Sequence, residues 1–396
     1  MNHTTESGAV PLLNRLRRFP DVEAANLQAW DATDSLLLDA ADGFLPEDGN
    51  VTVIGDRYGA LTLSLARTRS AARPLGAPGS AEAATPGLVR VHQDLVTGEK
   101  ALRNNAASLG IDGFVQLPLG PSLLSGARLV VMQLPRTLAE LEEAADAVAR
   151  YAEPDVVLLA GGRIKHMSLG MNNVLARCFE DVEPQLARQK SRVLVARTPK
   201  VPSGPLPYPI VDENAELGIT VCAHGAVFSG TKLDIGTRFL LTFLPKMASA
   251  SHAVDLGCGT GILAAMYARS HPDAQVTATD RSAAAVASAT CTAQANGLSG
   301  RIKILQDDAM ESLPEASAGL ILLNPPFHLG ASVHAGAGIK LFEAAARVLE
   351  PGGELWTVFN SHLPYLPALE RLVGRTMVQG RNTKFTVARS ISRGRN

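Results

Sequence analysis

The chain carries almost no net charge, and this sets the first limit on its partners. Its 37 Lys and Arg nearly balance its 38 Asp and Glu, which leaves a formal net charge of −1. Without excess positive charge a protein exerts no global attraction on nucleic acid, so any RNA binding must come from local patches. The end of the chain after Glu370 offers such a patch or, alternatively, a solvated basic tail. It has no acidic residue, and its basic residues are Arg371, Arg375, Arg381, Lys384, Arg389, Arg393 and Arg395.

Cysteines, aromatic residues and long apolar runs are also scarce. The aromatic share is 5%, and the four cysteines do not lie at the spacing of a metal site. So few cysteines fit a reduced, cytoplasmic protein without a metal centre. No apolar run approaches the roughly 20 residues that span a membrane, and the polar segment 1–6 lacks the core of a signal peptide. We therefore expect neither a membrane nor a metal as a partner. The cysteines are Cys178, Cys222, Cys258 and Cys291.

What the chain does have is length for two domains and one pattern that occurs twice. With 396 residues and 46% apolar content, it can bury two cores. Segments 51–66 and 253–268 each read as an apolar strand, a glycine turn and a helix. Segments 88–94 and 275–280 read as the next strand of each copy, which pairs Asp94 with Asp280, and segment 73–87 reads as a loop inserted in the first copy.

The two copies differ where chemistry would occur. The first turn carries Asp56, Arg57 and Tyr58 where the second carries smaller residues, and bulky side chains keep a backbone away from a ligand. We interpret the first copy as degenerate; the alternative is an unrelated α/β domain with a chance match. A Pro-rich run begins near residue 198 and is typical of a stiff linker. The predicted division is a degenerate domain at 1–197, a linker with a hairpin at 198–232, and an active domain at 233–396.

The second glycine turn predicts a nucleotide-like cofactor. Asp255 ends an apolar strand, and Gly257, Gly259 and Gly261 then open a helix, so that the backbone can approach a ligand at the carboxyl end of the sheet. An acidic residue here favours an amine-bearing or cationic ligand over a pyrophosphate, although NAD-binding proteins and purely structural turns share the spacing. Asp280 ends the next strand, where a carboxylate holds ribose hydroxyls; the alternative role is a helix N-cap.

Two further segments complete the predicted cofactor site. Asp308 and Ala309 follow the third strand, where a carboxylate accepts from the adenine amine, and the neighbouring Asp307 leaves this assignment open. Asp234 and Gly236 precede the first strand of the second copy and are expected to close over the end of the cofactor that lies away from its base. The alternative is that this pair simply begins a helix.

The most specific motif is Asn324-Pro325-Pro326-Phe327, which follows the apolar strand 320–323. The Asn324 side-chain carbonyl and the Pro325 carbonyl are acceptors that can draw aside both hydrogens of an exocyclic amine. The proline pair stiffens the loop, and Phe327 offers a face for stacking a base, worth roughly 1–3 kcal/mol. His328 is expected to be structural, with orientation of the loop or contact with the substrate as the alternative. The alternative is a Pro-rich loop without chemistry.

These motifs resemble those of class I S-adenosylmethionine-dependent methyltransferases, and the full set is similar to the bacterial ribosomal RNA guanine-N2 methyltransferases. The additional segments that carry the resemblance are 227–236, 352–360 and 382–387. The resemblance implies two tandem α/β, Rossmann-like domains with mostly parallel seven-stranded sheets, the last strand antiparallel, and a degenerate first domain that helps to bind RNA. It also implies S-adenosylmethionine as cofactor, held by Asp255, Gly257, Cys258, Gly259, Asp280, Asp308 and Ala309 and bordered by Asn324, with guanine held by Asn324, Pro325, Pro326 and Phe327.

The same resemblance favours 23S over 16S ribosomal RNA as the substrate. Segments 16–20 and 27–32, together with Arg238 to Leu241, are similar to the 23S type. Asn-Pro-Pro followed by an aromatic residue also serves adenine-N6 and glutamine-N5 methylation, so these substrates remain alternatives. A noncatalytic RNA-binding assembly factor is a further alternative that the intact second glycine turn argues against. An NAD-dependent oxidoreductase would leave Asn324 to Phe327 without a role.

Overall fold

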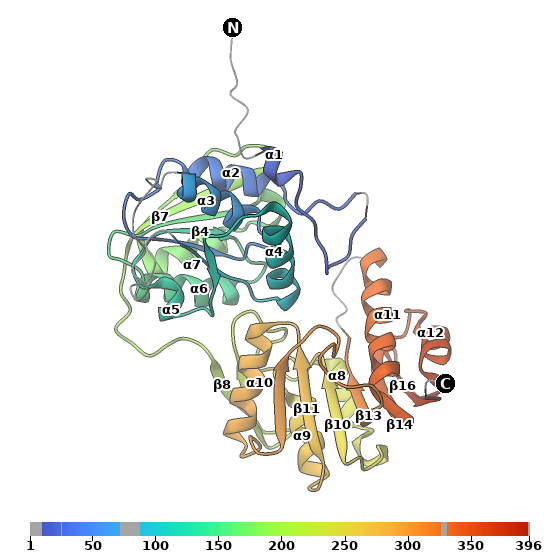
Figure 1. Cartoon of the computed structure of the whole chain (residues 1–396). Coiled ribbons are helices and arrows are strands. Elements are labelled where there is room, and N and C mark those ends of the chain that lie inside the picture. The colour runs from blue at the N-terminus through green and yellow to red at the C-terminus, as the bar shows by residue number, and fades with distance from the viewer. Residues whose placement is uncertain (1–9, 25, 72–87, 326–330, 395–396) are drawn as a thin grey trace. The chain divides into compact units, whose positions relative to one another are not determined.

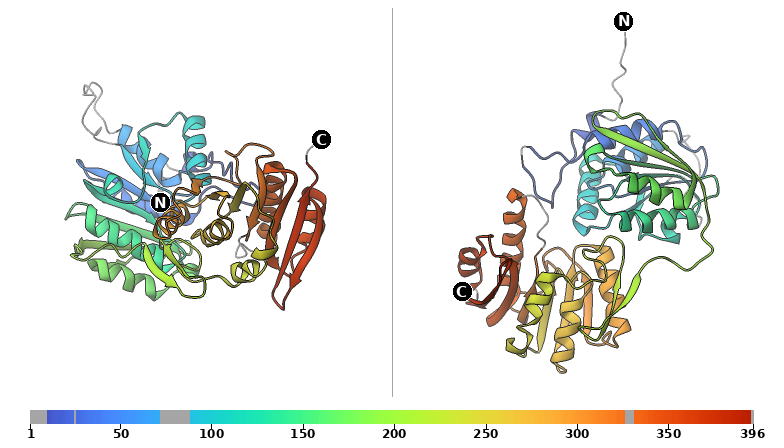
Figure 2. Two further views of the ribbon diagram at one scale, coloured as in Figure 1. Left: turned by 90° about the horizontal axis from the view of Figure 1, so that it is seen from below. Right: turned by 180° about the vertical axis from the view of Figure 1, so that it is seen from behind.

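The computed structural model describes residues 10–24, 26–71, 88–325 and 331–394. The chain forms two compact units, Met1–Pro207 and Tyr208–Asn396. Each unit is a sheet with helices on both faces (Figure 1, Figure 2). Within the described residues, no helix is both long enough and apolar enough to cross a membrane.

The first unit contains a seven-stranded sheet in the order β3-β2-β1-β4-β5-β7-β6. All paired neighbours are parallel except those of β7, which runs antiparallel to β5 and β6. The strands are β1 (Asn50–Ile54), β2 (Val89–His92), β3 (Phe114–Gln116), β4 (Ala127–Gln133), β5 (Val157–Arg163), β6 (Phe179–Pro184) and β7 (Ser191–Pro199). The helices are α1 (Val10–Leu13), α2 (Ala32–Ala41), α3 (Ala60–Ala71), α4 (Val96–Leu109), α5 (Pro121–Leu124), α6 (Leu138–Tyr151) and α7 (Leu169–Cys178), with a 3-10 turn at Ile164–His166.

The second unit repeats this topology in the order β12-β11-β10-β13-β14-β16-β15. Its last strand, β16, is antiparallel to both neighbours. The strands are β10 (His252–Leu256), β11 (Gln275–Asp280), β12 (Ile302–Gln306), β13 (Ala318–Leu323), β14 (Leu349–Asn360), β15 (Gly374–Arg381) and β16 (Phe385–Ser392). The helices are α8 (Ile235–Leu241), α9 (Ile262–Ser270), α10 (Ala283–Ala295), α11 (Ala331–Val348) and α12 (Tyr365–Leu372), with a 3-10 turn at Leu244–Lys246. The expected fold class, two tandem Rossmann-like sheets with an antiparallel last strand, is confirmed.

Burial on both faces explains why the central strands are continuously apolar. Along β13, Leu320 and Leu322 join one core cluster of the second unit, and Ile321 and Leu323 join the other. Alternate side chains point to opposite faces of a sheet, so helices must cover both. Each fully buried side chain of this size contributes roughly 1.5–3 kcal/mol. This packing fixes the end of β13, and therefore the backbone that leads into Asn324.

The sheet registers align the two copies and correct one pairing. The Gly55 N–H donates to the His92 carbonyl at 3.0 Å, and the Gly257 N–H donates to the Thr279 carbonyl at 2.8 Å. His92 therefore corresponds to Thr279, and the next residue, Gln93, corresponds to Asp280. Pairing Asp94 with Asp280 is wrong by one residue, because segment 73–87 interrupts the sequence comparison just before this strand.

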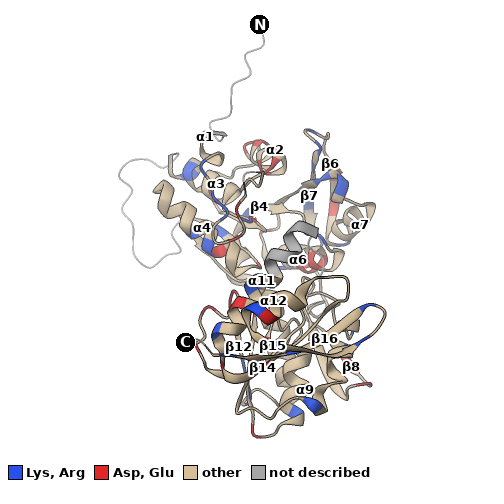
Figure 3. Cartoon of the chain, turned by 90° about the vertical axis from the view of Figure 1, so that its right-hand side faces the viewer, with Lys and Arg blue, Asp and Glu red and all other residues tan. Residues whose placement is uncertain are grey.

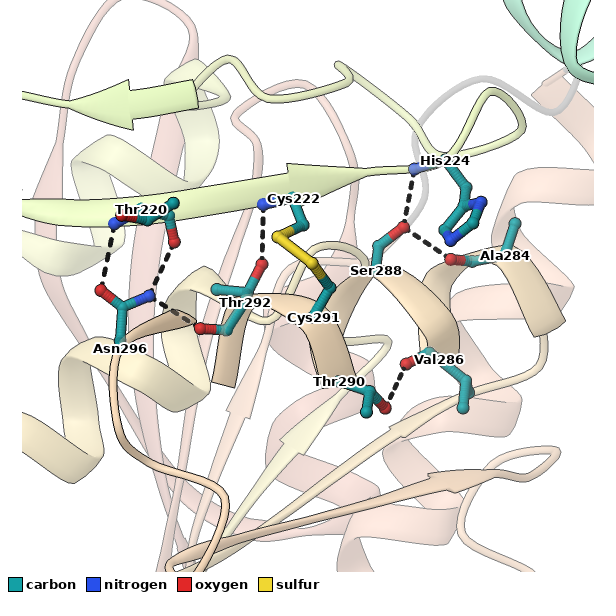
Figure 4. The surroundings of a disulfide bond; sticks show 10 residues. All are labelled: Thr220, Cys222, His224, Ala284, Val286, Ser288, Thr290, Cys291, Thr292 and Asn296. Carbon is teal, nitrogen blue, oxygen red and sulfur yellow. Dashed lines mark hydrogen bonds between the residues drawn. A yellow bond between two sulfur atoms is a disulfide. The ribbon is translucent and has the colours of Figure 1, made fainter. Parts of the chain in front are cut away.

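A hairpin of β8 (Ile210–Asn214) and β9 (Ile219–Ala223) belongs to the second unit, where β9 packs against α10. Two side chains of α10 and one from its C-cap residue bond the backbone of this strand edge (Figure 4). Thr292 accepts from the Cys222 N–H, Ser288 accepts from the His224 N–H, and Asn296 bonds both backbone groups of Thr220. Steps of four helical residues and of two strand residues cover similar distances, which is why the bonds repeat.

The same contact brings two cysteines together. Cys222 of β9 and Cys291 of α10 form a disulfide, with 5.7 Å between their Cα atoms. Cys178 and Cys258 are buried free thiols. The expectation of four reduced cysteines is therefore wrong for one pair. These two residues lie 69 positions apart, so only the docking of the hairpin reveals their proximity.

Candidate functional site

The predicted site residues of the second unit gather at the carboxyl ends of three adjacent strands. In the sheet, β10 lies between β11 and β13. The glycine turn follows β10, Asp280 ends β11 and Asn324 follows β13. The chain order of the strands reverses between β10 and β13, and this is where open α/β sheets bind ligands.

The glycine turn leaves open space beside its backbone. Gly257, Gly259 and Gly261 have φ values of +74°, +53° and +78°, a region that glycine enters without strain. A Cβ at Gly257 or Gly259 would meet no atom within 4 Å, whereas at Gly261 it would lie 3.0 Å from the Ala289 side chain. The first two glycines thus border free space, and the third lets α9 pack against α10.

Asp255 lies buried beneath this turn. Its Oδ2 accepts from the Ala264 N–H of α9 at 2.9 Å, and its Oδ1 has no hydrogen-bond partner among the described residues. Burial raises the pKa of this carboxyl to about 7, against the smaller opposing effect of the Ala264 bond. A buried acceptor without a donor can bind an amine-bearing ligand or, when protonated, donate to one.

The Asp280 carboxylate is held at the mouth of the turn. Its Oδ2 accepts from the Gly259 N–H at 3.0 Å and its Oδ1 accepts from the Ser282 N–H at 3.0 Å. The N-cap of α10 is Ser282, whose hydroxyl accepts from the Ala285 N–H. The alternative interpretation of Asp280 as the N-cap is therefore wrong. Two backbone donors fix the orientation of the carboxylate.

The two acidic residues after β12 have different surroundings. Asp307 is buried, and its Oδ2 accepts from both the backbone N–H and the hydroxyl of Ser312. Asp308 forms an ion pair with Lys340 of α11. Ala309 and Met310 then adopt left-handed φ values of +55° and +57°. Such strained backbone recurs at ligand sites, where the fold must hold it in place.

The Asn324 amide is anchored to α8. Its Nδ2 donates to Asp234 Oδ2 at 3.0 Å and to Thr237 Oγ1 at 2.9 Å. Its Oδ1 is buried and has no hydrogen-bond partner among the described residues. Asp234 is also the N-cap of α8, so the alternative interpretation of this segment as a helix start is confirmed as one of its roles. Thr237 is absent from the residues singled out in the sequence, although it lies in the same motif.

The described part of the predicted motif ends at Pro325. Pro325 is buried, whereas Pro326, Phe327 and His328 lie outside the described residues. Among the described residues, the hydrogen-bond partners of the Asn324 side chain are Thr237 of α8 and Asp234, the N-cap of this helix.

In the first unit, side chains fill the corresponding turn. The buried Asp56 accepts from the backbone N–H groups of Gly59 and Thr62. Gln93, the counterpart of Asp280, donates to the Asp56 carbonyl. A Cβ at Gly55, the counterpart of Gly257, would lie 3.2 Å from the Gln133 carbonyl oxygen, whereas one at Gly257 would meet no atom within 4 Å. The first turn thus has the shape of a cofactor turn but lacks the free space beside its backbone that a cofactor would occupy.

The charged residues at the C-terminal end are partly neutralised within the unit. Arg389 pairs with Glu354, and Arg393 lies 3.5 Å from Glu370. Exposed basic side chains remain on α12, on β15 and in the turn before β16; they are Arg371, Arg375, Arg381 and Lys384. Figure 3 shows basic and acidic segments interspersed along the ribbon. Among the described residues after Glu370, these positions and the exposed Arg393 make up the candidate basic patch; Arg395 lies outside the described residues.

Comparison with known families and relatives covers nearly the whole chain. Residues 12–200 match the family described as "RLMG N-terminal domain", and residues 218–389 match "Methyltransferase small domain". A protein of Streptomyces avermitilis named ribosomal RNA large subunit methyltransferase G is 34% identical, covering 96% of this chain and 97% of its own length. A protein of the same name from Shewanella amazonensis is 35% identical, with 95% of each chain covered.

A solved structure has the same architecture. A 16S rRNA N2 methyltransferase of T. Thermophilus, in complex with AdoMet and guanosine, matches with a TM-score of 0.71 and covers 92% of each chain. At 22% identity, this likeness concerns the fold. It shows that the tandem arrangement occurs in another protein of similar extent.

Proposed function

Since the chain belongs to the ribosomal RNA large subunit methyltransferase G family, we propose that it transfers a methyl group from S-adenosylmethionine to the exocyclic N2 of a guanine in 23S ribosomal RNA. The observation that carries the proposal is the Asn324 Oδ1, a buried acceptor without a partner among the described residues. Asn324 follows β13, which is the neighbour of β10, the strand that leads into the glycine turn. An acceptor in this position suits the hydrogens of an amine that is about to be alkylated.

The open glycine turn and its carboxylates fit S-adenosylmethionine. A Cβ at Gly257 or Gly259 would project into free space, so the backbone there can lie against a ligand. We propose that Asp280 binds the ribose and that Asp308 with Ala309 contacts the adenine, because Asp307 is buried and accepts two hydrogen bonds from Ser312, whereas Asp308 pairs only with the exposed Lys340 among the described residues. The proposed cofactor residues are Asp234, Gly236, Asp255, Gly257, Cys258, Gly259, Asp280, Asp308 and Ala309. Asn324 is proposed to border the cofactor at its methyl group without contributing much to its affinity. The bound cofactor supplies an electrophilic methyl group.

The protein's contribution to the reaction is orientation of the amine. In our proposal the Asn324 Oδ1 and the Pro325 carbonyl accept the two hydrogens of the guanine N2 group. The nitrogen lone pair then points away from both acceptors, toward the methyl group, and the excess proton passes to water after transfer. Pro326 and Phe327 are proposed to stiffen the loop and to stack on the base. Positioning and exclusion of water lower the barrier without a dedicated base.

The remaining parts of the proposal concern RNA binding. We propose that the first unit is the degenerate copy and contributes RNA contacts, since side chains fill its turn. The exposed basic residues near the C-terminus, among them Arg375 and Lys384, are proposed to bind phosphates locally. A ribosomal substrate also accords with the expected cytoplasmic location. The domain limits 1–197, 198–232 and 233–396 remain our proposal for the functional division.

A second candidate keeps the chemistry and changes the acceptor. An unpaired amide oxygen serves the amino group of adenine or the side-chain amide of glutamine as well as that of guanine. Methylation of 16S ribosomal RNA is the nearest alternative, and adenine-N6 or glutamine-N5 methylation is more distant. These substrates differ in product and can be separated in one experiment.

The test is methyl transfer from labelled S-adenosylmethionine to a panel of unmodified substrates. The panel contains 23S rRNA, 16S rRNA, tRNA and a peptide release factor. Label in 23S rRNA alone supports the proposal, and label in 16S rRNA keeps the chemistry but changes the substrate. Label in the release factor or in adenine overturns the guanine assignment. Absence of cofactor binding would favour the noncatalytic assembly factor.

A further inference from the structure

Both hydrogens of the Asn324 amide nitrogen are used on the side that faces α8. One points to Asp234 Oδ2 at 3.0 Å and the other to Thr237 Oγ1 at 2.9 Å. An amide has only these two donors. With both satisfied by one helix, the carbonyl oxygen must point away from it, and that oxygen is the buried atom without a partner among the described residues.

The charge of Asp234 determines which way the amide faces. Its Oδ2 already accepts from the N–H groups of Gly236 and Thr237, at 2.9 and 3.1 Å. An ionised carboxylate only accepts hydrogen bonds. If the amide rotated by half a turn, its oxygen would stand about 3 Å from this carboxylate oxygen, without a hydrogen between them. The orientation with the nitrogen toward α8 is therefore strongly preferred.

Gly236 provides the space that the amide occupies. A Cβ built at this residue would lie 3.0 Å from Asp234 Oδ2, 3.3 Å from Asn324 Oδ1 and 3.5 Å from Asn324 Nδ2. The φ of Gly236 is outside the left-handed region, so its backbone does not require glycine. A side chain here would crowd the Asp234 carboxylate and the Asn324 amide, which would have to shift to make room for it.

The first unit contains a simpler version of the same contact. There Asp31 is the N-cap of α2, Asp34 is its third residue, and the Gln133 amide donates to Asp34. The counterpart of Gly236 is Thr33, whose side chain is buried and bonds Ser191. Both copies therefore have a hydrogen bond from the amide to the helix. Only the copy with the open turn has a glycine beside the amide and a hydroxyl group as its acceptor.

We propose that Asp234 and Thr237 are positioning residues for methyl transfer, which hold the Asn324 amide with its oxygen toward the substrate and so select an exocyclic amino group over a carbonyl at that point. This inference rests on the proposed function of Asn324. It assigns Thr237 a role, and it gives Asp234 a role that is separate from contact with the cofactor.

The test compares Thr237→Val with Thr237→Ser. Valine has nearly the shape of threonine but lacks the acceptor, and serine restores the hydroxyl. We expect Thr237→Val to lower kcat roughly tenfold, the loss expected for one hydrogen bond, with little change in the KM for RNA or in the Kd for S-adenosylmethionine. Thr237→Ser should recover most of the lost rate. A purely structural role would lower the melting temperature in step with activity.

Gly236→Ala gives an independent test, because alanine favours a helix more than glycine does. We expect a folded protein with a kcat at least tenfold lower, because the new Cβ must displace the Asp234 carboxylate or the Asn324 amide by a few tenths of an ångström. Gly300→Ala is the matched control, since a Cβ there meets no atom within 4 Å and its φ is outside the left-handed region. A Gly236→Ala variant with wild-type kcat would overturn the proposal.

A readout without substrate separates this inference from the proposed function. In protein labelled with ¹⁵N at asparagine, the Asn324 side-chain signal is identified by its loss in Asn324→Asp. Slow exchange of both amide hydrogens with water in the wild type, and faster exchange of one in Thr237→Val, would support the anchored amide. Rapid exchange of both in the wild type would overturn it. If the amide is anchored but no RNA is methylated, the proposed function fails while the geometry stands.

Discussion

Gln133 and Asn324 occupy equivalent positions in the two sheets. Met132 pairs with Ile54 in the first sheet and Leu323 pairs with Leu256 in the second, and the amide residue follows directly in each case. Both amides donate to the third residue of the helix that comes before the first strand of its sheet in the chain, Asp34 of α2 and Thr237 of α8. The two copies thus share a scaffold and differ in the residues placed on it. This relationship supplies a matched control in the first unit for changes made in the second.

The role of Asn324 is tested by Asn324→Ala, with Gln133→Ala as its counterpart in the first unit. Loss of the acceptor should reduce methyl transfer by a factor of at least about 100, comparable to removal of a preorganised hydrogen-bonding group from other active sites. The Kd for S-adenosylmethionine should change little. Single-turnover transfer and calorimetric binding measure the two quantities. A wild-type rate in Asn324→Ala would remove this residue from the mechanism.

The role of Asp280 is tested against its register counterpart, Gln93. We expect Asp280→Ala to weaken binding of S-adenosylmethionine by roughly a hundredfold or more, because two charge-assisted hydrogen bonds to ribose are each worth about 1.5–3 kcal/mol and about 1.4 kcal/mol is a factor of ten. Gln93→Ala should leave that affinity unchanged, since Gln93 is bonded to the Asp56 carbonyl. Isothermal titration calorimetry of both variants gives the comparison. Equal losses in the two would contradict the assignment of a single cofactor turn.

The buried Asp255 predicts a pH dependence of stability. Its pKa rises from 3.8 to about 7 in the folded protein, so between these values the folded state holds a proton that the unfolded state has released. The stabilisation is complete below pH 3.8 and is lost as the pH rises through about 7. Asp255→Asn has no carboxyl group to lose a proton. As the pH rises, the free energy of unfolding of this variant minus that of the wild type should therefore increase by several kcal/mol, the order of magnitude that corresponds to the pKa shift of Asp255.

This comparison uses urea unfolding at pH 5 and pH 8 in the absence of cofactor. If the free energy of unfolding differs between variant and wild type by the same amount at both pH values, Asp255 is already ionised in the folded protein across this range.

Much of the fold could be predicted because its signals are local. The duplicated strand, glycine turn and helix depend on residues close in sequence, such as Gly55 with Gly59 and Gly257 with Gly261. Contacts over long separations could not be predicted. The bond between Thr237 and Asn324 spans 87 residues, and no periodicity or spacing relates the two. The disulfide was not predicted for the same reason. The one-residue error at Asp94 arose because the exact length of the insertion at 73–87 cannot be inferred from the local sequence pattern.

The hairpin contact predicts a specific loss of stability. Asn296 bonds the N–H and the carbonyl of Thr220, at 3.0 and 2.7 Å. Asn296→Ala leaves these backbone groups without their partners and should cost about 1–3 kcal/mol. Gln294→Ala is the control, because Gln294 is an exposed residue of the same helix. Urea unfolding under reducing conditions isolates the hydrogen bonds from the disulfide, and equal stability of the two variants would show that the strand edge does not depend on them.

The most direct test of the central claim is the chemical identity of the methylated atom. Unmodified 23S rRNA is incubated with the protein and S-adenosylmethionine, then digested to nucleosides and analysed by mass spectrometry beside authentic standards. We predict N2-methylguanosine at one position with the wild type and none with Asn324→Ala. Methylation at another atom, or N2-methylguanosine formed equally well by Asn324→Ala, would contradict the account of an amine held by the Asn324 carbonyl.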